Sequence, residues 1–255
     1  YLRPDGTPKK PGELIRNTGL AETLGIIARE GAEAFYTGSI AARIVADMQA
    51  KGGLLSAEDL AAYAPVRSAP LTVDYRGRTI AMPQPPAGGL VVGQMLKLLE
   101  RFDLVALGHN SADYIRILSE AMLIAGIDKE AFMGDPRFVD IPVERLLSGA
   151  YADACAARIR AGERAVLTRA NNDKGTTTLT CVDAQGMVAT LTHTLGLPSG
   201  VIPPGSGFML NGAMNWYDPR PGRPGSLAPG KKRYSSMTPT IVLEDGQAVA
   251  ALGSP

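Results

Sequence analysis

The sequence predicts an α+β protein, and three observations lead to that prediction. In the first two thirds of the 255-residue chain, apolar residues recur at spacings of three and four, which is typical of helices that bury one face. Beyond Arg160, alternating apolar and polar residues separated by glycine-containing turns are typical of strand pairs. Helices and strands are therefore grouped along the chain, which favours layered α+β packing over alternating βαβ units.

Six segments are expected to be helical. One of them is followed by Gly52-Gly53, a pair that commonly ends a helix, and Ser56 with Asp59 three residues later has the pattern of an N-terminal cap. The apolar spacing predicts helices over Leu20–Arg29, Ile40–Met48, from Ser56 onwards, Leu90–Phe102, Ser111–Ala125 and Val143–Arg160.

Three strand pairs are expected. Leu71, Val73 and Tyr75 alternate before Arg76-Gly77, which indicates a hairpin that continues to Met82. Two later hairpins are predicted from the same alternation around glycine-containing turns. They comprise Thr176–Asp183 with Met187–Leu195, and Thr240–Leu243 with Ala248–Leu252.

Composition argues for a globular protein that acts on a small molecule. The chain is 45% apolar and 20% charged, and its net charge of +1 supplies no field that would attract nucleic acid or an acidic membrane. Cys155 and Cys181 lie among small or apolar residues, so both are expected to be buried free thiols. The chain opens without methionine and stops just after a strand-like run, so we expect a fragment and assign no compartment.

The stretch Asp173–Thr194 holds seven threonines in 22 residues. Threonine is β-branched and favours strands, so ordinary sheet propensity is the first interpretation. If the turn is the three-residue loop Ala184–Gly186, Thr176 lies opposite Thr194 with their Cβ atoms about 5 Å apart. A two-residue loop would slip the register by one and bring His193 opposite Thr176 instead.

Several segments, in one order, resemble the γ-glutamyltransferase (γ-glutamyltranspeptidase, or glutathione hydrolase) family of N-terminal-nucleophile hydrolases. The segments after residue 174 are "GTTTLTCVDAQGMVATLTHTLG", "SGVIPPGSGFMLNGAM", "YSSMTPTIV" and "GSP". The segments before it are "AFYTGSIAARIV", "GGLLSAEDLAAY", "VDYRGRTIAMPQPPAGG" and "AFMGDPRF". The resemblance implies part of a four-layer αββα sandwich. Residues 1–175 would then be mostly helical large-subunit sequence and 176–255 mostly strand-forming small-subunit sequence, together one domain.

The resemblance also implies the catalytic residues. A precursor would cut itself between Gly175 and Thr176, and the new α-amine of Thr176 would act as general base for its own hydroxyl, with Thr194 as the second hydroxyl. Ser235 and Ser236 match serines that hold the substrate's α-carboxylate. The implied donor is glutathione or a related amide, and the acceptor is water, an amino acid or a peptide. No cofactor or metal is implied, and His109 and His193 are interpreted as structural.

Other family positions are absent or altered. The glycine pair of the oxyanion hole would follow Pro255, and a substrate-binding arginine would precede Tyr1, so both are expected outside this chain. Histidine two after the nucleophile is replaced by Thr178, and asparagine two after Thr194 by Gly196. Ala213 and Trp216 stand where side chains receive the substrate's α-amino group, so glutamyl specificity is in question.

Three functional readings stay open. The chain is part of a γ-glutamyltransferase, of an acylase that acts on a glutaryl or polymeric amide, or of a non-catalytic remnant that serves as a binding module. The segment Tyr217–Lys232 is short, proline-rich and basic. A solvated loop is a slightly better interpretation of its charges than an anion-binding site.

Overall fold

The structure is a computed structural model that describes residues 2–167 and 176–254. The chain divides into two compact units, each of which takes segments from both sides of residue 175. One unit runs up to Val66 and includes Pro198–Asn211, and the other consists of Arg67–Leu197 and the residues from Gly212 on.

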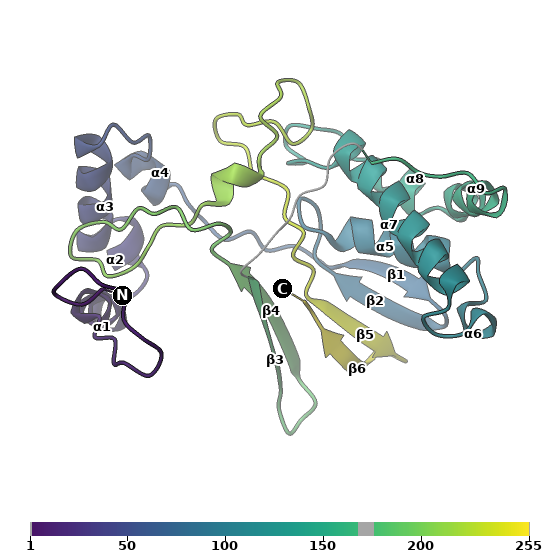
Figure 1. Ribbon diagram of the computed structural model, residues 1–255, viewed down its shortest axis with the longest axis horizontal. Coiled ribbons are helices and arrows are strands. Elements are labelled where there is room, and N and C mark those ends of the chain that lie inside the picture. The colour runs from purple at the N-terminus through teal and green to yellow at the C-terminus, as the bar shows by residue number, and fades with distance from the viewer. Residues whose placement is uncertain (1, 168–175, 255) are drawn as a thin grey trace. The chain divides into compact units, whose positions relative to one another are not determined.

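The unit that contains the start of the chain is helical (Figure 1). Ser56 and Asp59 form the expected capping box, with Asp59 N–H donating to Ser56 Oγ and Ser56 N–H to the Asp59 carboxylate. The apolar faces of the helices form one core around Ile40 and Ile44, against which Phe208 packs. Its helices are α1 (Thr18–Glu30), α2 (Glu33–Tyr36), α3 (Ser39–Ala50) and α4 (Ala57–Ala61).

The other unit contains an antiparallel sheet of four strands in the order β1-β2-β5-β6. It joins two hairpins that lie far apart in the sequence, because Ile80 on β2 pairs with Val242 on β5. The strands are β1 (Leu71–Tyr75), β2 (Arg78–Met82), β5 (Thr240–Glu244) and β6 (Gln247–Leu252). Both hairpins were predicted, but their union in one sheet was not.

Helices cover one face of this sheet (Figure 1). Helix α5 contacts β1 and β2, and Val73, Ile80 and Met82 form a core between strands and helix. Outer helices pack on α5, where Leu98 shares a core with Ile124 and Ile159. The helices of this unit are α5 (Gly89–Leu99), α6 (Leu104–Leu107), α7 (Ala112–Phe132), α8 (Val143–Leu147) and α9 (Gly149–Arg160), with the short 3₁₀ helix η1 (Ala213–Trp216).

A separate two-stranded sheet is formed by β3 (Thr176–Val182) and β4 (Val188–Thr194), and both strands contact β6 (Figure 1). Gly253, just after β6, comes so close to the hairpin that a Cβ there would lie 2.6 Å from Thr178 Cγ2. The end of β6 is therefore held directly against the threonine face of β3 and β4.

Several details differ from the predictions, among them the helix expected to end at Ala125, which continues to Phe132. The expected single helix Val143–Arg160 is two helices, because Ser148 adopts an extended conformation and its Oγ accepts a hydrogen bond from Tyr151 N–H, which starts α9. Cys155 is buried as expected, but Cys181 is exposed on β3. No helix in the described part of the chain is long and apolar enough to cross a lipid bilayer.

Candidate active site

The threonine hairpin has the register in which Thr176 is paired with Thr194. The turn explains this register, because Asp183 Oδ1 accepts hydrogen bonds from Gln185 N–H (2.9 Å) and Met187 N–H (2.8 Å). Gly186 has φ +82°, a conformation that other residues rarely adopt, and closes the three-residue loop. Of the two registers that the sequence left open, the structure has the one with the three-residue loop, and the register with His193 opposite Thr176 is excluded.

A row of threonine hydroxyls follows the face of the hairpin that carries Thr176 and Thr194. The Oγ1 atoms of Thr178 and Thr192 lie 2.9 Å apart, and Thr192 is buried. At the head of the row, Thr194 Oγ1 accepts a hydrogen bond of 2.9 Å from Gly196 N–H. A hydroxyl that accepts from an amide can still donate its own proton, so Thr194 can act as a donor beside Thr176.

Thr176 lines a pocket of about 360 Å³ whose lining comes from four segments of the chain. Ser236 and its neighbours form one wall, and the residues just after β6 form another. The full lining consists of Val92, Thr176, Ser236, Met237, Thr238, Thr240, Leu252, Gly253 and Ser254. Thr176 and Ser236, which the family resemblance placed in one active site, thus line the same pocket. Gly175, the other side of the expected cleavage site, lies outside the described residues.

The segment that carries Ser235 and Ser236 rests on the proline-rich turn before α5. Ser235 N–H donates to Pro86 O (2.8 Å), and a Cβ on Gly88 would lie only 2.6 Å from Ser236 O. Only glycine allows this approach. The connection of this turn with the site was not predicted, although the pair Gly88-Gly89 at the start of a helix is a signal of close backbone contact.

Three of the residues that depart from the family pattern, Gly196, Ala213 and Trp216, lie together. A Cβ on Gly196 would lie 3.2 Å from the Trp216 ring and 3.5 Å from Ala213 Cα. The guanidinium of Arg233 lies over the Trp216 ring, 3.8 Å from its centroid. One face of the indole is therefore already covered by a cation.

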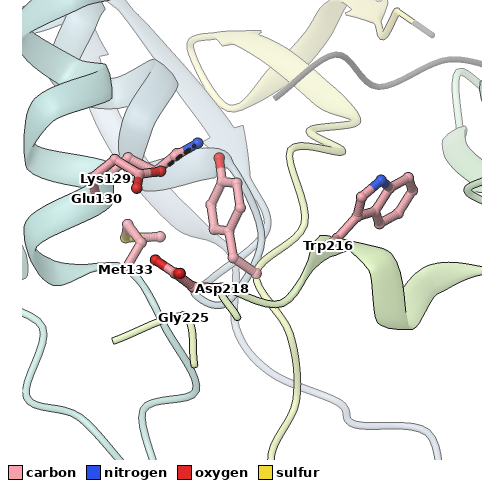
Figure 2. A pocket seen from close by; sticks show the side chains of 7 residues that line it. Lys129, Glu130, Met133, Trp216, Asp218 and Gly225 are labelled. Carbon is pink, nitrogen blue, oxygen red and sulfur yellow. Dashed lines mark ion pairs between the residues drawn. The ribbon is translucent and has the colours of Figure 1, made fainter. Parts of the chain in front are cut away.

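Charged side chains of the Tyr217–Lys232 loop make contacts with other residues of the protein. Arg220 pairs with Asp218 (2.6 Å) and with Glu130 of α7 (3.5 Å), and Lys231 Nζ lies 5.7 Å from the centroid of the Phe138 ring. Figure 2 shows Asp218 of this loop facing the end of α7. These contacts give the loop a structural role and account for part of its basic character.

Both histidines lie outside the pocket lining. His193 pairs with Thr177, so it belongs to the opposite face of the hairpin from Thr176, and it is exposed. His109 lies before α7 with its ring 5.7 Å from that of Tyr114. Among residues 2–167 and 176–254, no cluster of three His, Cys, Asp or Glu side chains could hold a metal ion.

Comparisons with known proteins agree with this geometry. The family described as Gamma-glutamyltranspeptidase matches residues 1–255. A glutathione hydrolase proenzyme of Escherichia coli (strain K12) is 36% identical over 98% of this chain and 47% of its own length. An acylase ACY 1 proenzyme of Pseudomonas sp. (strain V22) is 40% identical over 100% of this chain and 47% of its own.

Solved structures give a similar result. The crystal structure of a cephalosporin acylase from Bacillus halodurans superposes with a TM-score of 0.83 at 29% identity, and the match covers 97% of this chain and 46% of that one. This chain therefore spans about half the length of the curated relatives that it matches.

Proposed function

The chain belongs to the γ-glutamyltranspeptidase family and has the α+β fold of N-terminal-nucleophile hydrolases, and on this premise we propose that a full-length protein containing it transfers or hydrolyses γ-glutamyl or related acyl groups. Its nucleophile is Thr176, exposed as an N-terminus when the precursor cuts itself after Gly175. The observation that supports this most is the position of Thr176, which is paired with Thr194 and lines a pocket with Ser236.

The chemistry needs no group beyond these residues and a set of oxyanion donors. A free α-amine has a pKa of about 7.7–8.0, so part of it is unprotonated at neutral pH and can take the proton of Thr176 Oγ1. Oγ1 attacks the amide carbonyl, the amine leaves with that proton, and an ester forms on Thr176. Water or the amine of an amino acid or peptide then attacks the ester and releases the acyl group.

Thr194 and the serine pair have supporting roles in this proposal. The Thr194 hydroxyl, oriented by Gly196 N–H, donates to Thr176 Oγ1 and selects the rotamer that attacks. Ser235 and Ser236 hold the carboxylate at the far end of the acyl group through hydroxyl and backbone donors. Ser236 is the better placed of the two in this structure, because it lines the pocket.

Processing of the precursor tests the proposal. On a denaturing gel the full-length protein should separate into two polypeptides, and N-terminal sequencing of the smaller should begin at Thr176. A single band after prolonged incubation at neutral pH would favour the non-catalytic binding module over the enzyme.

Two classes of acyl donor are compatible with this proposal. Glutathione-type donors are the expectation from relatives named glutathione hydrolase, and glutaryl or polymeric amides are the alternative, which relatives named acylase support. The structure favours the second for one reason. Gly196 and Ala213 lack side-chain acceptors, and Arg233 covers a face of Trp216, so a substrate ammonium group finds little to bind at this cluster.

A comparison of two anilides should show this specificity. We expect a glutaryl anilide to be cleaved with kcat/KM within about tenfold of the matching γ-glutamyl anilide. Each charge-assisted bond to an ammonium is worth about 1.5–3 kcal/mol, so an enzyme with acceptors for it would discriminate far more strongly. A preference of a thousandfold or more for the γ-glutamyl anilide would mean that other acceptors hold the ammonium group.

A further inference from the structure

A tight turn directly after α7 connects the helix layer to the segment that carries the serine pair. In Asp135-Pro136-Arg137, Asp135 Oδ1 accepts from Arg137 N–H (3.0 Å) and Oδ2 accepts from Arg137 Nη2 (2.6 Å). Asp135 is 1% exposed, whereas the Arg137 side chain is 58% exposed. The hydrogen bonds and charge of Arg137 hold the pKa of the Asp135 carboxyl well below its usual range, so this buried group stays ionised.

The same two side chains also bind the chain just before the serines. Lys232 N–H donates to Asp135 Oδ2 (2.7 Å), and Arg137 Nη2 donates to Gly230 O (2.6 Å). Lys232 precedes Ser235 by three residues. The buried Asp135 carboxylate and Arg137 thus hold the backbone just before Ser235 and Ser236.

Hydrogen bonds to the turn before α5 hold the same stretch of backbone at Ser235 and Met237. Ser235 N–H donates to Pro86 O (2.8 Å), and Gly88 N–H donates to Met237 O (3.4 Å). The backbone from Gly230 to Met237 is therefore held between the turn after α7 and the turn before α5. Hydrogen bonds therefore hold the backbone on both sides of Ser236.

A second turn of the same sequence fastens the other end of the loop. In Asp218-Pro219-Arg220, Asp218 Oδ1 accepts from Arg220 N–H (2.9 Å) and Oδ2 from Arg220 Nη2 (2.6 Å). Arg220 reaches Glu130 on the last turn of α7. Figure 2 shows Asp218 opposite Glu130 and Met133, around a cavity of only about 30 Å³. Two Asp-Pro-Arg turns therefore fix the two ends of the loop against α7.

We propose that Asp135 and Arg137 are positioning residues that hold Ser235 and Ser236 where they bind the carboxylate of the acyl group. The inference rests on the proposed function, since it assumes that this serine pair binds a carboxylate. Replacing Asp135 by asparagine keeps its size but leaves one oxygen acceptor and adds an N–H₂ donor, which would face the donors of Arg137 and Lys232. The segment would shift away, and carboxylate binding would weaken while Thr176 keeps its place.

The test compares substrates with and without the carboxylate in the full-length protein. Glutaryl and butyryl p-nitroanilides differ only in that group. In Asp135→Asn and Arg137→Gln we expect the ratio of their kcat/KM values to fall about tenfold or more, through a higher KM for the glutaryl substrate. The butyryl rate and cleavage before Thr176 should be unchanged.

The matched control is Asp153→Asn. Asp153 also pairs with an arginine (Arg101, 2.7 Å), but its side chain is 67% exposed and lies on α9. Exposed pairs contribute little, so the control should behave like the wild type in both substrates and in processing. Arg137→Gln changes an exposed side chain and decides the test if Asp135→Asn does not fold.

The outcomes separate the inference from the proposed function. If the wild type cleaves neither anilide, the proposed function is wrong. If the wild type prefers the glutaryl substrate and both variants keep that preference, the function stands and the positioning role is wrong. An equal loss with both substrates would indicate a general structural role and would also overturn the inference.

Discussion

The substitution Thr176→Ala should leave the precursor as one polypeptide and abolish amide cleavage. One hydroxyl serves both steps in the proposed mechanism, because it attacks first the peptide bond before it and then the substrate. Loss of a nucleophile of this kind reduces kcat by on the order of 10⁴-fold or more. Denaturing gels and release of p-nitroaniline measure the two steps independently.

The loss can be separated from misfolding. Thr176 begins β3 and is half-buried, and a cross-strand threonine contributes only about 0.2–1 kcal/mol relative to alanine, so the variant should fold. Thr176→Ser keeps the hydroxyl and should still be processed and active at a reduced rate. Turnover retained by Thr176→Ala would exclude this residue as the nucleophile.

The pairing of Thr176 with Thr194 could be predicted from sequence, as one of two possible registers, because the hairpin is local. Asp183 and Gly186 determine the turn by side-chain and backbone chemistry within four residues, and the turn determines that Thr176 faces Thr194. The β1–β2 and β5–β6 hairpins were predictable for the same reason. Their boundaries depend on alternation and on glycine, both of which are visible in the sequence.

Long-range contacts could not be predicted in the same way. The pairing of Ile80 with Val242, which joins two hairpins in one sheet, depends on tertiary packing and leaves no periodic signal. The bond from Lys232 N–H to Asp135 depends on how the chain returns to the end of α7. The repeated Asp-Pro-Arg was visible in the sequence, but only the structure relates each copy to the loop between them.

The roles of Ser235 and Ser236 came from resemblance, and the structure adds a physical reason for their placement. The carbonyl of Ser236 lies so close to Gly88 that any side chain there would collide with it. A proline-rich turn with its adjoining glycine pair and a serine pair much later in the sequence therefore form one backbone arrangement. This arrangement supports a second prediction with a large effect.

Gly88→Ala should impair substrate binding while processing continues. The new Cβ would lie 2.4 Å from Thr238 Oγ1 and 2.6 Å from Ser236 O, and a backbone carbonyl cannot turn away as a side chain can. Gly88 has φ −75° and ψ −2°, which alanine adopts readily, so the effect is steric and not conformational. A displacement of about 1 Å in a substrate-positioning segment can cost about 10²-fold in kcat/KM.

Gly25→Ala on α1 is the matched control for this prediction. Its Cβ would meet only the end of the Arg29 side chain, at 3.3 Å, and alanine is favoured over glycine within a helix by about 1 kcal/mol. We therefore expect Gly25→Ala to raise the melting temperature and keep kcat/KM, whereas Gly88→Ala lowers kcat/KM for the glutaryl anilide and is still cleaved before Thr176. Wild-type kcat/KM in Gly88→Ala would show that the Ser236 segment tolerates displacement, and that the carboxylate is held elsewhere in the pocket.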